Sequence, residues 1–141
     1  MEQECVCDWM TAEVITISPD TSLAEAHEIM RTRSIRRLPV IDRGRIVGIV
    51  TLGDVHAAEP TDASSLSVWE MNDMLANLKV VDIMTRNPVT IKESATIGET
   101  AQIMLEKKFS GLPLVDDGGR LVGIITESDI FRLVARERSQ A

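Results

Sequence analysis

The sequence predicts an α/β fold of the α+β kind, in which two β-α-β-β-α repeats pack sheet to sheet as a pseudo-twofold pair. The first observation behind this prediction is an internal repeat: residues 8–11 (DWMT) recur as 82–85 (DIMT), and residues 45–51 (RIVGIVT) recur as 120–126 (RLVGIIT). The second is that strand-like runs, helix-like runs and glycine turns follow one another in the same order in both copies. About fifty residues bury too little surface to be secure alone, so we expect the two copies to fold together.

The spacing of the repeat sets the expected domain organisation. Matching residues are 74 positions apart as far as Gly44 and 75 apart after the extra Gly119, as for Met10 with Met84 and Asp54 with Asp129. A turn is where a repeat tolerates a single insertion. We therefore expect a first repeat with an N-terminal leading segment at 1–58, a linker containing a helix at 59–79, and a second repeat at 80–141.

Each copy contains the same predicted elements. A β-branched run predicts a first strand at 14–17 and 89–91, and Ser or Thr before an apolar helical pattern predicts helices that begin after 20–22 and 94–96. Hairpins are predicted at 38–50 and 112–125, and a last helix follows each Thr-x-x-Asp. The linker carries an apolar stripe that predicts either a packed connector or a dimer contact, and its members are Val68, Met71, Met74, Leu75 and Leu78.

Composition excludes several classes of protein. The net charge of −7 and an aromatic content of 3% disfavour nucleic-acid binding, which needs basic patches and stacking rings. The sequence contains no apolar run near the ~18 residues of a membrane span. The acidic start of the chain does not resemble a secretory signal. These features predict a protein without a membrane segment and with a cytoplasmic location.

Catalytic and metal-binding motifs are absent from the sequence. Cys5 and Cys7 are too close together to close a large stabilising loop, so a disulfide framework is not indicated, and two small side chains in a leading segment are the simpler interpretation. A metal site would need two further ligands. His27 and His56 have no counterparts in the second copy and are expected to be surface residues. We therefore expect no enzyme activity, no metal and no required cofactor.

The ordered motifs resemble the cystathionine-β-synthase-type (CBS) domain. In both copies Met-Thr precedes a hydrophobic-Thr-hydrophobic strand, then Leu-Pro with an Asp, then Val-Gly followed by Thr-x-x-Asp. The connector at 66–70 (LSVWE) is similar to that of stand-alone prokaryotic CBS-pair proteins, and the chain also resembles the CBS part of acetoin-utilisation-type proteins. The resemblance implies a regulatory module, usually dimeric, with adenosine nucleotides such as AMP, ADP or ATP bound in clefts between the repeats, and an unknown regulated partner protein.

The resemblance also implies the site residues. Thr51 with Asp54 and Thr126 with Asp129 would bind phosphate and ribose where a strand meets a helix. A helix capping box is the alternative interpretation of the same spacing, and the two can coexist. The base would lie among residues of the first two strands of each copy: Ile15, Thr16, Arg36, Arg37, Leu38 and Pro39 in the first, and Val89, Thr90, Ser110, Gly111, Leu112 and Pro113 in the second. Each proline removes a backbone donor and so leaves a neighbouring carbonyl free.

The two sites differ in predicted charge. Arg36 and Arg37 stand where the second copy has Ser110 and Gly111. They suit phosphate contact, which would make the first site favour di- or triphosphates and let the second accept AMP or an uncharged adenosine; alternatively, they belong to a solvated basic face. A ligand-free dimerisation or interaction scaffold is the alternative function. S-adenosylmethionine, NAD and nucleic acid are less favoured partners.

Overall fold

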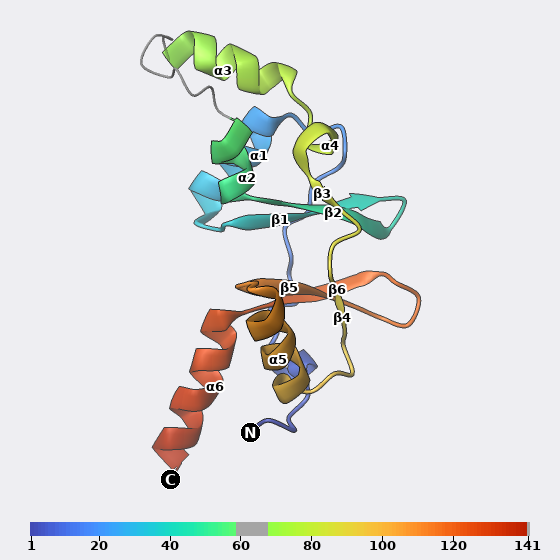
Figure 1. The fold of residues 1–141 in the computed structure, drawn as a ribbon, viewed down its shortest axis with the longest axis vertical. Coiled ribbons are helices and arrows are strands. Elements are labelled where there is room, and N and C mark those ends of the chain that lie inside the picture. Colours follow the sequence, from blue (N-terminus) through green and yellow to red (C-terminus); the bar gives the residue numbers. More distant parts are fainter. Residues whose placement is uncertain (59–67, 141) are drawn as a thin grey trace. The chain divides into compact units, whose positions relative to one another are not determined.

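The computed structural model describes residues 1–58 and 68–140, which form two compact units (Figure 1). One unit is residues 15–88, and the other combines residues 1–14 with 89–141. Each unit therefore contains most of one repeat together with the first residues of the other repeat. The elements of the first unit are α1 (Leu23–Arg33), β1 (Arg37–Asp42), β2 (Arg45–Thr51), α2 (Leu52–Ala58), α3 (Val68–Asn77), α4 (Val80–Ile83) and β3 (Thr85–Arg86). Those of the second are η1 (Val6–Asp8), β4 (Ile91–Lys92), α5 (Ile97–Lys107), β5 (Gly111–Val115), β6 (Leu121–Thr126) and α6 (Glu127–Gln140).

The sheet of the 15–88 unit has the antiparallel order β1-β2-β3. The first strand predicted at 14–17 is reduced to one parallel bridge between Ile17 and Val40, so that prediction was too long. Proline explains the shortening. Ile17 N donates to Pro39 O at 3.1 Å and Ile41 N donates to Ile17 O at 2.8 Å, so the next bond of this ladder would need the N–H that Pro39 lacks.

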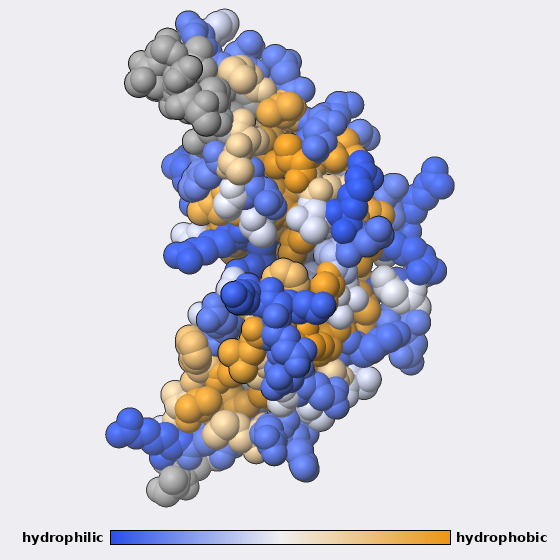
Figure 2. Space-filling model, in the orientation of Figure 1, coloured by the Kyte–Doolittle hydropathy of each residue, from blue (hydrophilic) through white to orange (hydrophobic). Residues whose placement is uncertain are grey.

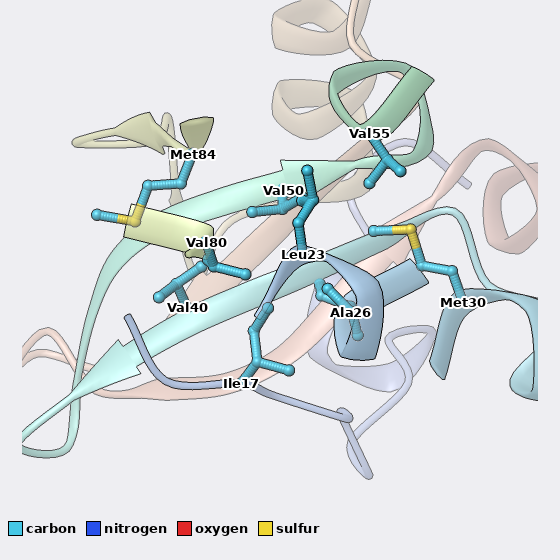
Figure 3. Close-up of a cluster of buried hydrophobic side chains, with 10 residues drawn as sticks. Ile17, Leu23, Ala26, Met30, Val40, Val50, Val55, Val80 and Met84 are labelled. Atoms are coloured by element: carbon cyan, nitrogen blue, oxygen red, sulfur yellow. The ribbon is translucent and has the colours of Figure 1, made fainter. Parts of the chain in front are cut away.

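Helix α1 forms where the sequence predicts it. Ser22 is its N-cap and accepts from Glu25 N at 3.1 Å, and Ser34 ends it in the left-handed conformation. The helix buries Leu23, Ala26 and Met30 in an aliphatic cluster that includes the strand residues Leu38, Val40 and Val50 (Figure 3). Val55 of α2 joins the same cluster, so both helices are held to the sheet through apolar contacts.

The second unit repeats this plan with the order β4-β5-β6. Its parallel pair β4–β5 places Ile91 beside Leu114, and Pro113 in β5 stands where Pro39 stands in β1. Thr96 caps α5 by accepting from Glu99 N at 3.1 Å. Its core again lacks aromatic side chains among the fully buried members, which are Val6, Leu112, Leu114, Ile125 and Leu133.

Each sheet is extended by the Met-Thr segment from the start of the other repeat. Thr85 pairs with Ile49 of β2, and Thr11 forms the equivalent bridge with Ile124 of β6. Gly48 and Gly123 make room for this approach. A Cβ at Gly48 would lie 2.9 Å from Met84 Cγ and 3.0 Å from Thr85 O, and one at Gly123 would meet Met10 in the same way. The group that lies against each of these glycines is therefore the methionine-bearing segment.

The N-terminal residues attach to the second unit by a series of backbone bonds. Val6 N donates to Ala95 O at 2.9 Å, and the carbonyls of Glu4 and Glu2 accept from Ile97 N and Gly98 N at 2.8 and 2.7 Å. Val6 is fully buried in the core of that unit. The segment expected to lead into the first repeat therefore packs with the second.

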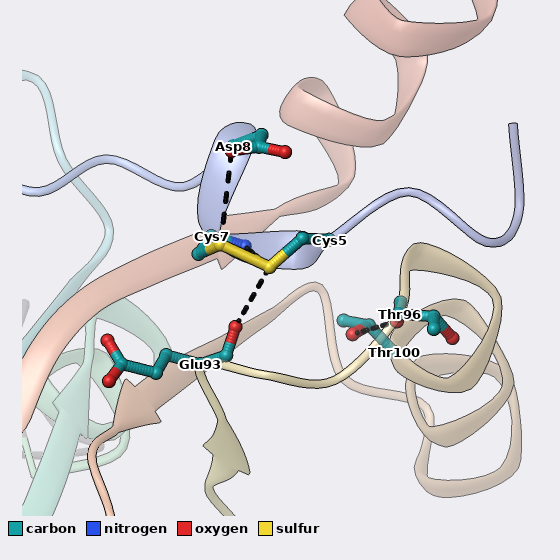
Figure 4. Close-up of a disulfide and its surroundings, with 6 residues drawn as sticks. All are labelled: Cys5, Cys7, Asp8, Glu93, Thr96 and Thr100. Carbon is teal, nitrogen blue, oxygen red and sulfur yellow. Dashed lines mark hydrogen bonds between the residues drawn. A yellow bond between two sulfur atoms is a disulfide. The ribbon is translucent and has the colours of Figure 1, made fainter.

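Cys5 and Cys7 form a disulfide in this segment, which corrects the interpretation of two unlinked small side chains (Figure 4). The 3₁₀ turn η1 brings them together, with Cys7 N donating to Cys5 Sγ at 3.3 Å. Cys5 Sγ also lies 3.2 Å from Glu93 O. Because a disulfide sulfur carries no proton, this contact becomes a hydrogen bond only when Cys5 is reduced. Among the described residues, no three His, Cys, Asp or Glu side chains are grouped to hold a metal ion.

The linker helix α3 packs against α1 in the 15–88 unit. Leu78 of the predicted stripe contacts the core of this unit, whereas Met74 is exposed. The side chains of Val68, Met71 and Leu75, and the linker residues 59–67, lie outside the described part of the chain. Trp69 is 75% exposed. No helix in the described ranges combines the length and apolarity needed to cross a bilayer.

Candidate functional site

In the 15–88 unit, the predicted site residues meet at one end of the sheet. Arg37 at the start of β1 pairs with Thr51 at the end of β2, and Leu52 N donates to Arg36 O at 2.8 Å. The segment of Ile15 and Thr16 leads to the bridge at Ile17, and so runs parallel to the start of β1. Three stretches that are far apart in the sequence are therefore neighbours.

The second unit brings the equivalent residues together in the same way. Gly111 pairs with Thr126, and Glu127 N donates to Ser110 O at 3.0 Å. Val89 and Thr90 lead into β4, which runs parallel to β5. All predicted residues of this second site belong to one unit, as do all those of the first.

Asp54 faces back towards the last residue of β2. Its Oδ2 accepts from Thr51 N at 2.9 Å, while Thr51 Oγ1 accepts from Asp54 N at 3.1 Å. These two bonds form a reciprocal capping box, so the structural alternative weighed from the sequence is present. The bonds occupy one carboxylate oxygen, and within the described residues no hydrogen bond to Oδ1 of Asp54 is found.

Asp129 repeats the backbone contact but is more fully occupied. Its Oδ2 accepts from Thr126 N at 2.9 Å and lies 3.2 Å from Thr126 Oγ1. Its Oδ1 accepts from Arg132 Nη1 at 2.6 Å, and the residue is only 5% exposed. Position 57, the equivalent of Arg132 under the offset of 75, is alanine. Arg132 was not among the predicted site residues, although Asp-x-x-Arg is a spacing at which helical side chains meet.

The prolines leave one carbonyl available in each sheet. The hydrogen-bond register places the missing N–H of Pro39 opposite the carbonyl of Ile15, and that of Pro113 opposite the carbonyl of Val89. A free carbonyl can accept a hydrogen bond from an amino group on a ligand. Each unit thus presents a carboxylate, a hydroxyl and a backbone acceptor near one sheet end.

Not every predicted residue offers a side chain. Leu38 and Leu112 are buried in the cores of their units, so at a site there they can contribute only backbone atoms. Arg36 is exposed, and Arg37 is half-buried with an interaction partner of its own. Ile15 is partly buried, and Val89 is exposed, so either could cover one face of a flat ligand.

A tandem α+β repeat with a Thr-x-x-Asp carboxylate at the same strand–helix junction of each copy defines a paired-repeat protein with duplicated candidate ligand sites. The chain belongs to the CBS domain family, because the family model of the CBS domain matches residues 6–60 and 80–136. These ranges overlap the two repeats expected at 1–58 and 80–141. The resemblance to CBS-pair proteins seen in the sequence is therefore confirmed.

Related sequences include proteins of similar length and longer ones. The uncharacterised protein MJ1225 of Methanocaldococcus jannaschii is 33% identical over 95% of this chain, which covers 48% of that protein. A CBS domain-containing protein of Dictyostelium discoideum is 39% identical, with 90% of this chain and 88% of that protein covered. The chain thus spans about half the length of MJ1225 and most of the Dictyostelium protein.

Solved structures show the same fold. CBSX2 of Arabidopsis thaliana in complex with AMP has a TM-score of 0.82 and 29% identity, covering 96% of this chain and 99% of that one. The CBS domain pair of MJ0100 in complex with 5′-methylthioadenosine and S-adenosyl-L-methionine has a TM-score of 0.76 and 33% identity, covering 94% and 97%. The mixed α+β fold with two three-stranded sheets is therefore the fold of CBS pairs.

Proposed function

We propose that this chain is a regulatory module that binds adenosine nucleotides at two sites, one in each repeat, and thereby modulates a partner protein. The observation that carries the proposal is the duplicated junction, at which a carboxylate acceptor and a backbone carbonyl freed by proline occur towards the same end of one sheet. An aspartate can accept hydrogen bonds from both ribose hydroxyls, and a free carbonyl can accept one from the adenine amino group. The related structures that contain AMP, or methylthioadenosine with S-adenosylmethionine, support the adenosine part.

Calorimetric titration with AMP, ADP and ATP tests the proposal. We expect two sites in the parent and one in each of Asp54→Asn and Asp129→Asn, because asparagine keeps an acceptor for the threonine N–H but loses the charge that favours ribose. Asp73→Asn, on the exposed side of α3, is the control. Single-site variants that bind all three nucleotides like the parent would contradict the ribose assignment. The absence of any binding would leave the ligand-free scaffold as the function.

The homodimer expected from the sequence is part of this proposal. Apolar side chains are exposed on the helices of the second unit, with Phe131 and Val134 on α6, Leu105 on α5 and Phe109 just after it. Figure 2 shows orange, apolar surface in the region of α6 among the blue hydrophilic side chains. A second copy could cover such side chains, since exposed apolar clusters mark interaction surfaces. Light scattering at micromolar concentration should give a dimer mass, and Phe131→Ser should lower it towards the monomer.

The partner and the location are predictions of the same proposal. No catalytic role is assigned to either site, because the groups described above are hydrogen-bond acceptors suited to binding. The regulated protein should bind the nucleotide-loaded module and the nucleotide-free module with different affinities, and this difference would identify it. The cytoplasmic location predicted from the sequence is tested by cell fractionation.

A further inference from the structure

The two aspartates differ in what already occupies them. Both accept from the N–H of their threonine at 2.9 Å, so their backbone positions match. Only Asp129 also accepts from an arginine, Arg132, which lies one helical turn further along α6. Ala57 takes this position in α2 and has no group that could do the same. The first site therefore presents an open carboxylate oxygen, whereas the second presents one that is already bound to a cation.

The ion pair at Asp129 is asymmetric in exposure. The side chain of Asp129 is 7% exposed and that of Arg132 is 68% exposed. The carboxylate is therefore fixed, while the guanidinium can turn away into solvent. A guanidinium has five N–H donors and binds phosphate well, so it can exchange a carboxylate for a ligand anion without losing charge-assisted bonds.

We infer that Arg132 is the specificity-determining residue of the second site and restricts it to adenosine ligands that carry an anionic 5′ group. This inference rests on the proposed function. Ribose hydroxyls must displace Arg132 from Asp129 Oδ1, and the displaced guanidinium then binds the 5′ phosphate. A ligand with a neutral or cationic 5′ group gives the guanidinium no replacement partner. Such a ligand must break the ion pair without compensation, so it binds more weakly. Arg132 thus revises the expectation that the second site accepts an uncharged adenosine.

The test compares AMP with adenosine, which differ only in the phosphate. In an Asp54→Asn background, which leaves the second site alone, we expect AMP to bind about tenfold or more tightly than adenosine, as one charge-assisted bond implies. Adding Arg132→Ala should weaken AMP binding and strengthen adenosine binding, so the ratio should approach one. Arg132→Lys should keep part of the ratio. Thr126 still bonds Asp129 in these variants, so the start of α6 is retained.

Arg138→Ala is the matched control, because it removes the same charge from an exposed position of the same helix. The inference is overturned if Arg132→Ala and Arg138→Ala leave the same AMP to adenosine ratio. Binding confined to the Asp54 site would also overturn it, and would reduce the proposed function to nucleotide binding at the first site alone. If neither site binds any adenosine compound, both the proposed function and this inference fail.

Discussion

Gly48 and Gly123 are the residues at which a methionine-bearing segment lies directly on a returning strand. Neither has a positive φ, so the reason for glycine there is space and not backbone conformation. The sulfur end of Met84 is flexible and could move, but the carbonyl of Thr85 is held by its pairing with Ile49. A side chain at Gly48 would therefore have to push β3 away from β2.

We predict that Gly48→Ala lowers the free energy of unfolding by about 1–3 kcal/mol, the usual cost of overpacking. Urea denaturation of the parent and the variant measures it. Gly53→Ala is the control, because an added Cβ there meets only Thr51 Oγ1 at 3.6 Å and alanine favours the helix. Equal stability of Gly48→Ala and the parent would mean that the contact between β2 and β3 is loose.

The disulfide between Cys5 and Cys7 should stabilise the protein only slightly. A bridge that closes a loop of three residues removes little entropy from the unfolded chain, equivalent to about 1.5 kcal/mol. The segment is also anchored independently by Val6 and by the ion pair between Glu4 and Arg136 at 3.0 Å. We predict that Cys5→Ser/Cys7→Ser lowers the urea-derived stability by no more than about 2 kcal/mol; unfolding of the double variant would show that the bridge secures the segment.

At the scale of elements, the turn between β5 and β6 is shaped by one carboxylate. Asp116 Oδ1 accepts from Arg120 N and Gly118 N, both at 2.9 Å. The backbone N–H of Arg120 is the main cause that lowers the pKa of the Asp116 carboxyl, and the N–H of Gly118 adds to it. Because the two N–H groups bind the ionised carboxylate more strongly than the protonated one, Asp116 stabilises the folded turn whenever it is ionised.

This sets a pH dependence with a definite sign. The folded-state pKa of Asp116 is lowered, so its contribution to stability is present above the unfolded value near 4 and is lost as the pH falls through the folded value. Asp116→Asn should therefore be less stable than the parent at pH 7, and the difference should shrink at pH 2–3. Urea midpoints at both pH values measure this. Asp73→Asn controls for the change of charge, and a difference that persists at pH 2 would contradict the assignment.

The elements that local sequence determines were predicted well. Ser22 and Thr96 cap the helices at the expected residues, and both hairpin turns occur, with Arg43, Gly44 and Gly119 at positive φ. Caps and turns need only neighbouring residues, so spacing suffices to find them. The first strands were overestimated, because their pairing depends on the distant Pro39 and Pro113.

The repeat predicted which residues come together but not the partners of each carboxylate. It placed Thr51, Asp54, Thr126 and Asp129 at equivalent junctions, and the structure brings the segments that contain Ile15 and Val89 to the same sheet ends. That these residues bind a ligand stays a prediction. Motif spacing does not show which partner satisfies a carboxylate. The spacing of Asp129 and Arg132 permits their pairing, but only the positions of the two side chains show that it forms.

At the scale of the whole molecule, the compact units and the sequence repeats have different boundaries. The 15–88 unit includes Val80 and Met84, which are buried in its core, although both follow the start of the second repeat. The N-terminal residues complete the other unit in the same manner. A cut at the repeat boundary would therefore remove core residues from both units.

Two fragments of equal length test this difference. Residues 15–88 keep the whole unit, whereas residues 6–79 keep the first repeat but lose α4 and β3. We predict that 15–88 unfolds cooperatively in urea and that 6–79 does not, because 6–79 leaves Gly48 uncovered and lacks Val80 and Met84. Circular dichroism during denaturation measures both. Equal cooperativity would show that the exchanged segment is dispensable.

The exchange of Met-Thr segments gives the chain the connectivity of a domain-swapped dimer written as one polypeptide. In each repeat, the Met-Thr segment pairs with the returning strand of the other repeat. The space at the glycine of its own returning strand is filled by the other repeat's Met-Thr segment. Two separate copies would exchange these segments with each other, and such domain swapping is a low-cost route from monomer to dimer. Joining the two copies in one chain keeps this exchange of segments and makes the association of the copies independent of protein concentration. Once fused, the copies could diverge, as Arg132 and Ala57 have, without losing their mutual dependence.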